Sequence, residues 1–224
     1  MDYYSKYLKY KNKYIGLKNG SIIGGARKSR AIVVSGPSGV GKDTIINEIM
    51  KKHPDSFIKN ISYTSRDPRG QEQRDVDYHF KTIQEMKNMI EEKKLLEYSK
   101  AGENIYGSST EYLDEATRLG KVLIFNIDVF GAESIQKYVK ESKKEGKKLN
   151  VKYIFIRPKD INTLYTRLKN RGTENEEQIQ KRINRATTEI NKADTMKFDI
   201  DVINDNLQDS IRIVENFLIK KKFI

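Results

Sequence analysis

The residues most clearly suited to chemistry form a glycine-rich run around a lysine. In order they are Gly36, Pro37, Ser38, Gly39, Val40, Gly41, Lys42, Asp43 and Thr44. The spacing is G-x-x-x-x-G-K, after a short apolar run at 31–35 and before residues with helical spacing. The glycines let backbone N–H groups turn inward, the helix N-terminus adds partial positive charge, and the lysine reaches the outer phosphates. This P-loop pattern predicts a binding site for a nucleoside triphosphate.

Asp43 stands where this motif usually carries a serine or threonine whose hydroxyl contacts Mg²⁺. A carboxylate there can bind the metal directly or through water, or can repel the phosphates. It can also serve only the helix start, where an acid is favourable. We expect Mg²⁺ as the cofactor, because the phosphate charge must be neutralised. The phosphates and water would hold it, with Asp43 or Thr44 as candidate ligands.

A second group of residues suits a dianionic phosphate. Arg66 and Arg69 flank Pro68, and Tyr78 follows a short distance along the chain. Charge-assisted hydrogen bonds from a guanidinium group are worth roughly 1.5–3 kcal/mol each. An arginine pair on a loop is commonly just surface, but a P-loop kinase also needs a site for the acceptor phosphate. We interpret the pair in that way.

Strand-like and helical patterns alternate from Ser29 onward. Apolar runs of strand length occur at 31–35, 122–127, 151–156 and 199–203, separated by residues with helical spacing. Asp160 is placed to cap one helix and Gly172 to end it. Apolar strands that alternate with helices predict an α/β fold with a parallel sheet covered on both faces.

Composition excludes several classes of function. The 224 residues include no cysteine, which rules out disulfides, thiolate zinc sites and cysteine nucleophiles. No run approaches the roughly 20 apolar residues of a membrane span, and the start lacks the apolar core of a signal peptide. We therefore expect a cytoplasmic location and no membrane partner. The net charge of +12 is concentrated in the N-terminal segment and at 140–148, which we interpret as solvated surface rather than a nucleic-acid contact.

Residues 1–28 differ from the rest and are predicted to form a basic, Tyr/Lys-rich extension. Five apolar or aromatic residues fall on one stripe of a helix: Tyr3, Tyr7, Tyr10, Tyr14 and Leu17. We expect this helix to dock on the domain or on an unknown partner, with a membrane or nucleic-acid contact as the alternative. The leader also resembles leaders on proteins of giant DNA viruses, in which case the cytoplasm would be that of a host.

From Ser29 to the C-terminus, the chain resembles the guanylate kinase family. The motifs are Gly-Pro-Ser-Gly-Val-Gly-Lys, Thr64-Ser65-Arg66-Asp67-Pro68-Arg69, Asp77-Tyr78-His79-Phe80, Leu96-Glu97-Tyr98, Asn104-Ile105-Tyr106-Gly107-Ser108, Asn126-Ile127-Asp128, Arg171-Gly172-Thr173 and Val202-Ile203-Asn204-Asp205. The resemblance implies a P-loop nucleoside-monophosphate kinase fold that transfers phosphate from ATP to GMP and dGMP. It also implies a guanylate kinase-like domain at 29–224, with a core (29–61, 109–159 and 196–224), a mobile GMP-binding lobe (62–108) and a helical lid (160–195).

The resemblance also assigns roles to individual residues. The phosphate set, for the GMP phosphate, is Arg66, Arg69, Tyr78 and Tyr106. The base set, for guanine, is Ser62, Glu97, Ser108 and Asp128. The chemistry agrees, because one carboxylate can accept both the N1–H and the 2-amino hydrogen of guanine, whereas adenine presents an acceptor at N1. Two such contacts discriminate by on the order of 3–5 kcal/mol.

In the lid, Arg171 and Arg182 match the family's catalytic arginines and join Lys42 and Arg66 in the expected catalytic set. Arg167 and Asn204 are expected at the ATP site, Asn204 near the adenine ring. The lid segment is rich in charge, and we expect it to be thin in apolar contacts and to swing inward before its arginines reach the phosphates. Asn126 stands where the family commonly has an acid, which leaves the organisation of metal-bound water open.

Three other functions fit parts of the pattern. A guanylate kinase-like protein-binding module would keep the fold without the chemistry. A small sugar-phosphate kinase of related fold would share Gly41-Lys42-Asp43 but would not need the combination of Ser62, Glu97 and Asp128. A kinase with broad deoxynucleotide specificity would use the same framework.

The P-loop assignment predicts that Lys42→Ala lowers turnover by about 10²-fold or more, because a charge contact to the NTP phosphates is lost in a closed site. Steady-state rates at saturating ATP measure this effect. A variant that turned over at nearly the wild-type rate would show that the motif is not a working P-loop.

Overall fold

The computed structural model describes residues 28–146, 149–172 and 174–224, without the side chain of Arg171. The predicted Tyr/Lys-rich helix therefore lies outside the described residues, as does Thr173. In chain order the elements are β1 (Ser29–Ser35), α2 (Lys42–Lys52), β2 (Phe57–Lys59), β3 (Tyr63–Thr64), β4 (His79–Phe80), α3 (Ile83–Glu91), β5 (Leu95–Ala101), β6 (Asn104–Ser109), α4 (Glu111–Leu119), β7 (Val122–Asn126), α5 (Val129–Lys144), β8 (Leu149–Arg157), α6 (Ile161–Arg171), α7 (Glu176–Asp194), β9 (Ile200–Ile203) and α8 (Leu207–Lys220).

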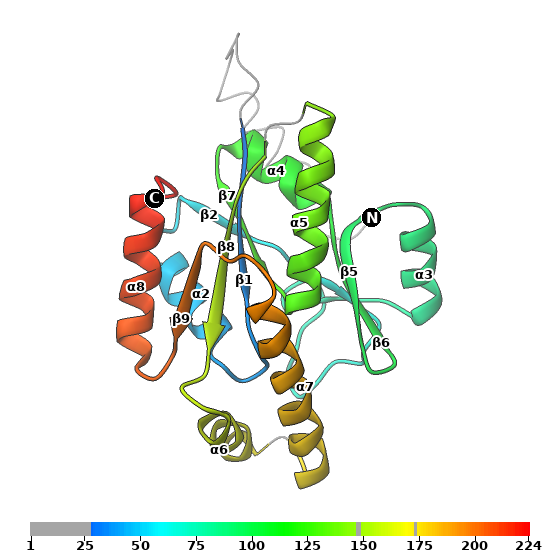
Figure 1. Ribbon diagram of the computed structural model, residues 1–224. Helices are drawn as coiled ribbons and strands as arrows, with labels where there is room; N and C mark the ends of the chain where they lie inside the picture. Colours follow the sequence, from blue (N-terminus) through cyan, green and yellow to red (C-terminus); the bar gives the residue numbers. More distant parts are fainter. Residues whose placement is uncertain (1–27, 147–148, 173) are drawn as a thin grey trace.

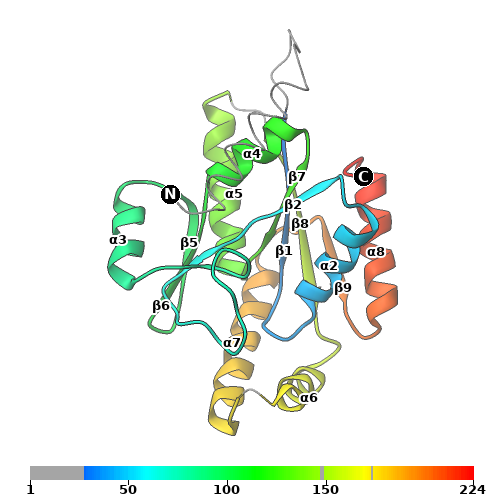
Figure 2. The same ribbon diagram turned by 180° about the vertical axis from the view of Figure 1, so that it is seen from behind.

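A five-stranded parallel sheet forms the core, in the order β2-β7-β1-β8-β9. Successive residues of β1 point to opposite faces, and both faces are buried. Ile32 packs in a cluster with residues of α2 and α8. Val33 packs with residues of α4 and α5 on the other side. Figures 1 and 2 show these helix pairs from opposite sides. The predicted α/β fold with a covered parallel sheet is confirmed.

A second sheet, which the sequence patterns did not predict, lies beside the core with the order β4-β3-β6-β5. Two of its strands are only two residues long. β5 and β6 are antiparallel and carry many polar residues. Helix α3 packs on this sheet through the buried Met86 and begins with a reciprocal cap between Thr82 and Glu85. The sheet gives the 62–108 segment a framework of its own.

Helices α6 and α7 lie at the carboxyl end of the core strands (Figure 1). The predicted cap is confirmed: Asp160 accepts a hydrogen bond from the Thr163 backbone, and Gly172 ends α6 in the left-handed conformation. The two helices share an apolar cluster that includes Leu164, Leu168 and Ile179. The expectation that this segment is thin in apolar contacts was therefore wrong.

The C-terminal half of α7 instead packs on the core. Ala193 and Ile190 contact the cluster that contains Val129 and Phe155. A single helix thus joins the region around α6 to the core. Within the described ranges, no helix combines the length and apolar character needed to span a membrane.

Candidate active site

The P-loop runs from the end of β1 into α2 through backbone conformations that suit glycine. Gly36 has φ 147°, and a Cβ atom there would lie 2.2 Å from the carbonyl oxygen of Ile156. Gly41 has φ 100°, and its Cβ would lie 2.5 Å from Asn204 Nδ2. Side chains are excluded at both positions, so the loop can pass close to β8 and to Asn204. This arrangement is what a backbone anion site requires.

Lys42 is folded back into the loop. Its Nζ donates to the carbonyl oxygens of Gly36 at 2.5 Å and Pro37 at 3.0 Å. Burial lowers the pKa of Lys42, and nearby carboxylates, with Glu189 first among them, act in the opposite direction. The lysine is therefore a desolvated cation whose present partners are neutral carbonyl groups. An entering phosphate would offer it a charged acceptor.

The structure brings two of the three lid arginines expected at the site to the P-loop. Arg182 NH1 lies 2.6 Å from Ser38 Oγ. Arg167 donates to the carbonyl oxygens of Asn204 at 2.9 Å and Val40 at 3.4 Å. The side chain of Arg171 lies outside the described residues. Arg182 thus contacts the loop in this structure, and the expected inward movement of the lid stays a prediction.

Asn204 bonds the loop directly, since its Nδ2 donates to Val40 O at 2.7 Å. Its predicted position near an adenine ring stays a prediction. The geometry shows a structural role as well, because Asn204 fills the space that Gly41 leaves open.

Asp43 forms a polar cluster just beyond Lys42. Its Oδ1 accepts from Asn126 Nδ2 at 2.8 Å and from Lys59 Nζ at 3.2 Å. The carboxylate is largely exposed, and its charge acts on the Tyr78 hydroxyl. Asp43 therefore lies between the P-loop and the phosphate set. Sequence reasoning missed Lys59, which comes at the end of a strand too short to be recognised.

The oxygen donors Asp43 and Thr44 suit Mg²⁺, which prefers hard oxygen ligands and usually keeps several waters. Both side chains are exposed at the start of α2. Among the described residues, no group of three or more acidic, histidine or cysteine side chains is placed to hold a metal ion. A Mg²⁺ ion here would therefore depend mainly on phosphate oxygens and water.

The phosphate set gathers around a buried arginine. Arg66 Nε donates to Tyr106 Oη at 3.2 Å, and its guanidinium carbon lies 5.4 Å from the centre of the Tyr78 ring. Burial raises the pKa of Tyr78 to about 12, so the phenol stays protonated and can donate. Arg69 is exposed, and its backbone N–H, rather than its side chain, bonds Glu72. The structure thus brings Arg66, Tyr78 and Tyr106 together, and Arg69 lies exposed on the same loop as Arg66.

Glu72 is a second residue that sequence reasoning missed. It pairs with Arg66, at 2.9 Å from NH1 to Oε2 and 3.0 Å from NH2 to Oε1. The pairing holds the arginine in one orientation, and it lowers the pKa of Glu72 despite the opposing effect of burial. An acid a few residues after an arginine turn is the only signal that the sequence offers for it.

The base set lies on neighbouring elements. Glu97 on β5 is almost fully buried, and Ser108 on β6 donates to its Oε1 at 2.7 Å. Asn60, which sequence reasoning also missed, donates to Ser108 Oγ at 2.9 Å and to Ser62 Oγ at 3.1 Å. One buried amide therefore ties both serines of the set to the glutamate.

Asp128 completes the base set from the other side. It caps α5 by accepting from the Gly131 backbone at 2.8 Å. A Cβ atom on Gly131 would lie 2.9 Å from Glu97 Oε2, so the two carboxylates flank this glycine. Burial first, and then the charge of Asp128, raise the pKa of Glu97 to about 8, against the effect of the Ser108 hydrogen bond.

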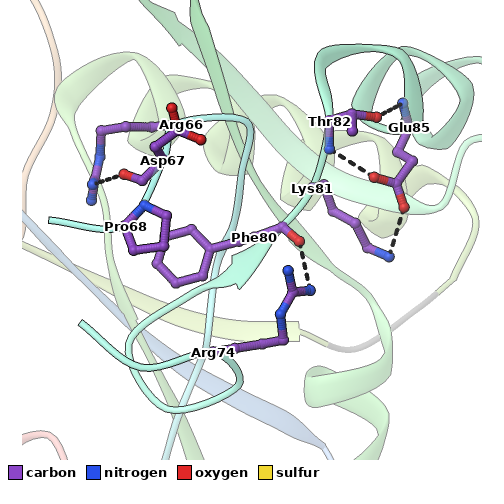
Figure 3. A pocket seen from close by; sticks show the side chains of 8 residues that line it. All are labelled: Arg66, Asp67, Pro68, Arg74, Phe80, Lys81, Thr82 and Glu85. Atoms are coloured by element: carbon purple, nitrogen blue, oxygen red, sulfur yellow. Dashed lines mark hydrogen bonds and ion pairs between the residues drawn. The ribbon is translucent and has the colours of Figure 1, made fainter. Parts of the chain in front are cut away.

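A hollow of about 360 Å³ opens beside the phosphate set. Figure 3 shows the side chains that line it, with Arg74 bonded to the Phe80 carbonyl and Lys81 paired with Glu85. Of its lining residues, Arg66 alone belongs to the expected site. The hollow therefore adjoins the phosphate set and does not include the base set.

The raised pKa of Glu97 predicts a pH-dependent effect of Glu97→Gln on stability. Folding disfavours the ionised form, so wild type loses stability relative to the variant as pH rises from about 4.5 to about 8. Thermal unfolding at pH 5, 7 and 9 should show a gap that widens with pH, on the order of a few kcal/mol in total. Glu91→Gln, at an exposed position on α3, is the matched control. A gap independent of pH would contradict the burial of a titrating carboxyl.

Comparison with known proteins places these features in a family. A family model described as guanylate kinase matches residues 28–221. Guanylate kinase 1 of Arabidopsis thaliana is 39% identical over 190 residues, which make up 84% of this chain and 47% of that protein. The guanylate kinase of Schizosaccharomyces pombe is 33% identical over 189 residues, covering 84% of this chain and 89% of the relative. That of Clostridium perfringens strain 13 is 38% identical over 191 residues, covering 85% and 83%.

The chain spans about half the length of the plant relatives and most of the length of the yeast and bacterial ones. Among solved structures, a guanylate kinase from Anaplasma phagocytophilum has the same fold, with a TM-score of 0.67, 22% identity and 87% of each chain covered. The family model covers nearly the whole described chain. This chain belongs to the guanylate kinase family.

Proposed function

We propose that this chain transfers the γ-phosphoryl group of ATP to GMP, and also to dGMP. The observation that carries the proposal is the buried Glu97, held by Ser108 and flanked by Asp128. Ionised, this carboxylate can accept the N1–H and a 2-amino hydrogen of guanine. Adenine would place its N1 lone pair against the same oxygen atoms, and a buried charge would be left without a partner.

The phosphate set would bind the acceptor. Arg66 would contribute a guanidinium already fixed by Glu72 and Tyr106, and the protonated Tyr78 would donate a further hydrogen bond. Little reorganisation is then needed when the phosphate arrives, which favours positioning for in-line transfer. Arg69 would reach the phosphate from its exposed position.

On the donor side, the P-loop would hold the triphosphate through its backbone N–H groups. Lys42 would turn from its carbonyl partners to the phosphate oxygens, and Arg182 and Arg171 would stabilise charge on the transferring group. Arg182 supports this role because it already touches Ser38 of the loop. Mg²⁺, where bound, would neutralise phosphate charge at the Asp43 and Thr44 end of the loop.

We also propose that 62–108 acts as the GMP-binding lobe and 160–195 as the lid. The separate sheet of the first segment and the apolar cluster of the second support this division. The presence of both Lys42 and Arg182 at the P-loop favours an enzyme over a protein-binding module of the same fold. The role of residues 1–28 stays a prediction.

The Asp43 cluster predicts that Asp43→Ser keeps activity within about tenfold of wild type, or roughly 1.4 kcal/mol in the barrier. Serine supplies the common hydroxyl, while Lys59 and Asn126 lose a shared acceptor. The Mg²⁺ concentration for half-maximal rate should change, because a charge beside the metal position is removed. A fall to below about one-hundredth of wild type would make Asp43 an essential ligand and contradict this prediction.

A coupled assay across GMP, dGMP, AMP, CMP, UMP, dTMP and ribose bisphosphate tests the proposed function. GMP and dGMP should be the best acceptors. Glu97→Gln should raise KM for GMP by about tenfold or more, the loss expected for a hydrogen bond to a charged group, and leave KM for ATP nearly unchanged. A preference for AMP or for ribose bisphosphate would overturn the proposal. ATP binding without turnover on any acceptor would favour the binding module.

A further inference from the structure

Arg185 lies on α7 where that helix passes from the α6 cluster to the core, and it contacts the base set. Its NH2 lies 2.7 Å from Asp128 Oδ2, and its Nε lies 2.7 Å from Glu189 Oε1. The Glu189 side chain is almost fully buried, and the Asp128 side chain is mostly buried. A single guanidinium therefore bridges the cap of α5 and a buried acid on its own helix.

The bridge accounts for much of the hydrogen bonding of Asp128. Oδ1 accepts from the Gly131 backbone, and Oδ2 accepts from Ser99 Oγ at 3.1 Å as well as from Arg185. Ser99 lies two residues after Glu97, on the same face of β5. The carboxylate of Asp128 is thus held against the strand that carries Glu97, and Arg185 supplies the charged member of that set of donors.

The nearby carboxyl groups explain why a cation is favourable at the position of Arg185. Glu97, Asp128 and Glu189 place three carboxyl groups in one region, and Lys42 also acts electrostatically on Glu189. The charge of Asp128 adds to burial in raising the pKa of both Glu97 and Glu189. Arg185 lies between two of them, and its fork can bond both at once. Without Arg185, Asp128 would lose its charged hydrogen-bond donor. The uncharged Gly131 backbone and Ser99 hydroxyl would then hold its carboxylate.

Guanine needs a second acceptor beside Glu97. Its Watson–Crick edge carries three N–H bonds, one on N1 and two on the 2-amino group. A carboxylate such as Glu97 can accept two of them. The remaining 2-amino hydrogen requires another acceptor, and Asp128, on the other side of Gly131, is placed to provide it.

We propose that Arg185 is a specificity-determining positioning residue. It orients the Asp128 carboxylate to accept the second 2-amino hydrogen of guanine, and it ties α7 to the base site through the same bond. This inference rests on the proposed function. The contact to the 2-amino group would distinguish GMP from IMP, because the hypoxanthine base of IMP lacks that group.

The test compares Arg185→Ala with Lys192→Ala. Lys192 joins α7 to Glu133 on α5 at 2.8 Å, so the control removes an ion pair of similar length and exposure between α7 and the same helix, away from the base set. Steady-state kcat and KM are measured for GMP, IMP and ATP. Arg185→Ala should raise KM for GMP by about tenfold, the loss expected for a hydrogen bond to a charged group, and leave KM for IMP and ATP within about twofold, the scatter of context effects. Lys192→Ala should change none of them.

Arg185→Lys and Asp128→Asn complete the design. Lysine keeps the charge without the fork, so KM for GMP should rise by less than in Arg185→Ala. Asp128→Asn combined with Arg185→Ala should add little to either single change, because both act on one contact. Thermal unfolding of each variant shows whether it is folded. If Arg185→Ala does not fold, the comparison is made with Arg185→Lys instead.

Two failures are distinguishable. A wild-type protein that does not phosphorylate GMP overturns the proposed function and this inference with it. A wild type that prefers GMP to IMP, with Arg185→Ala raising KM for both equally or with Lys192→Ala giving the same effect, overturns the inference alone. In that case Arg185 would only hold α7 in place.

Discussion

The close passage of Gly36 over β8 is the contact on which the rest of the site depends. A Cβ atom there would meet the Ile156 carbonyl at 2.2 Å, so the chain turns from β1 into α2 directly against a neighbouring strand. Because β1 is the central strand, the anion site is placed at the middle of the sheet edge. The carboxyl ends of β7 and β9 then bring Asn126, Asp128 and Asn204 to the same edge. Ligand sites of parallel α/β sheets form in this position.

Charge at this edge is divided between a basic donor side and an acidic base side. Lys42, Arg167 and Arg182 lie at the P-loop, whereas Glu97 and Asp128 lie at the position proposed for guanine, and Glu189 acts electrostatically on Lys42 as well as bonding Arg185. Desolvated groups of one sign destabilise the empty fold, and they strengthen contacts to a ligand of the opposite polarity. The raised pKa of Glu97 shows that burial of this carboxyl lowers folding stability when it is ionised, which is typical of a group that serves ligand recognition.

Sequence patterns predicted the elements that follow from local sequence alone, such as apolar strands and capped helix ends. The strands of the core sheet are buried on both faces and read as continuous apolar runs, and Asp160 and Gly172 mark helix ends by local geometry. The second sheet was missed, because β3 and β4 are only two residues long and because β5 and β6 carry many polar residues that break up an apolar run. Lys59, Asn60, Glu72 and Arg185 were missed for a different reason. The partners of Lys59, Asn60 and Arg185 that matter for the site are distant in the chain, and the local signal for Glu72 is only an acid shortly after the arginine turn, whereas the motif residues carry their signal in the chain.

The two departures from the family pattern near the P-loop form one feature in space. Asp43 replaces the usual hydroxyl, and Asn126 stands where an acid is common, yet Asn126 Nδ2 donates to Asp43 Oδ1 at 2.8 Å. Two carboxylates at that distance would repel, so an acid at 43 is compatible with an amide at 126. Lys59 adds a cation to the same oxygen atom. The edge therefore keeps one carboxylate beside the P-loop, on the first turn of α2 rather than at the end of β7. For this reason, the departure at 43 does not by itself argue against phosphoryl transfer.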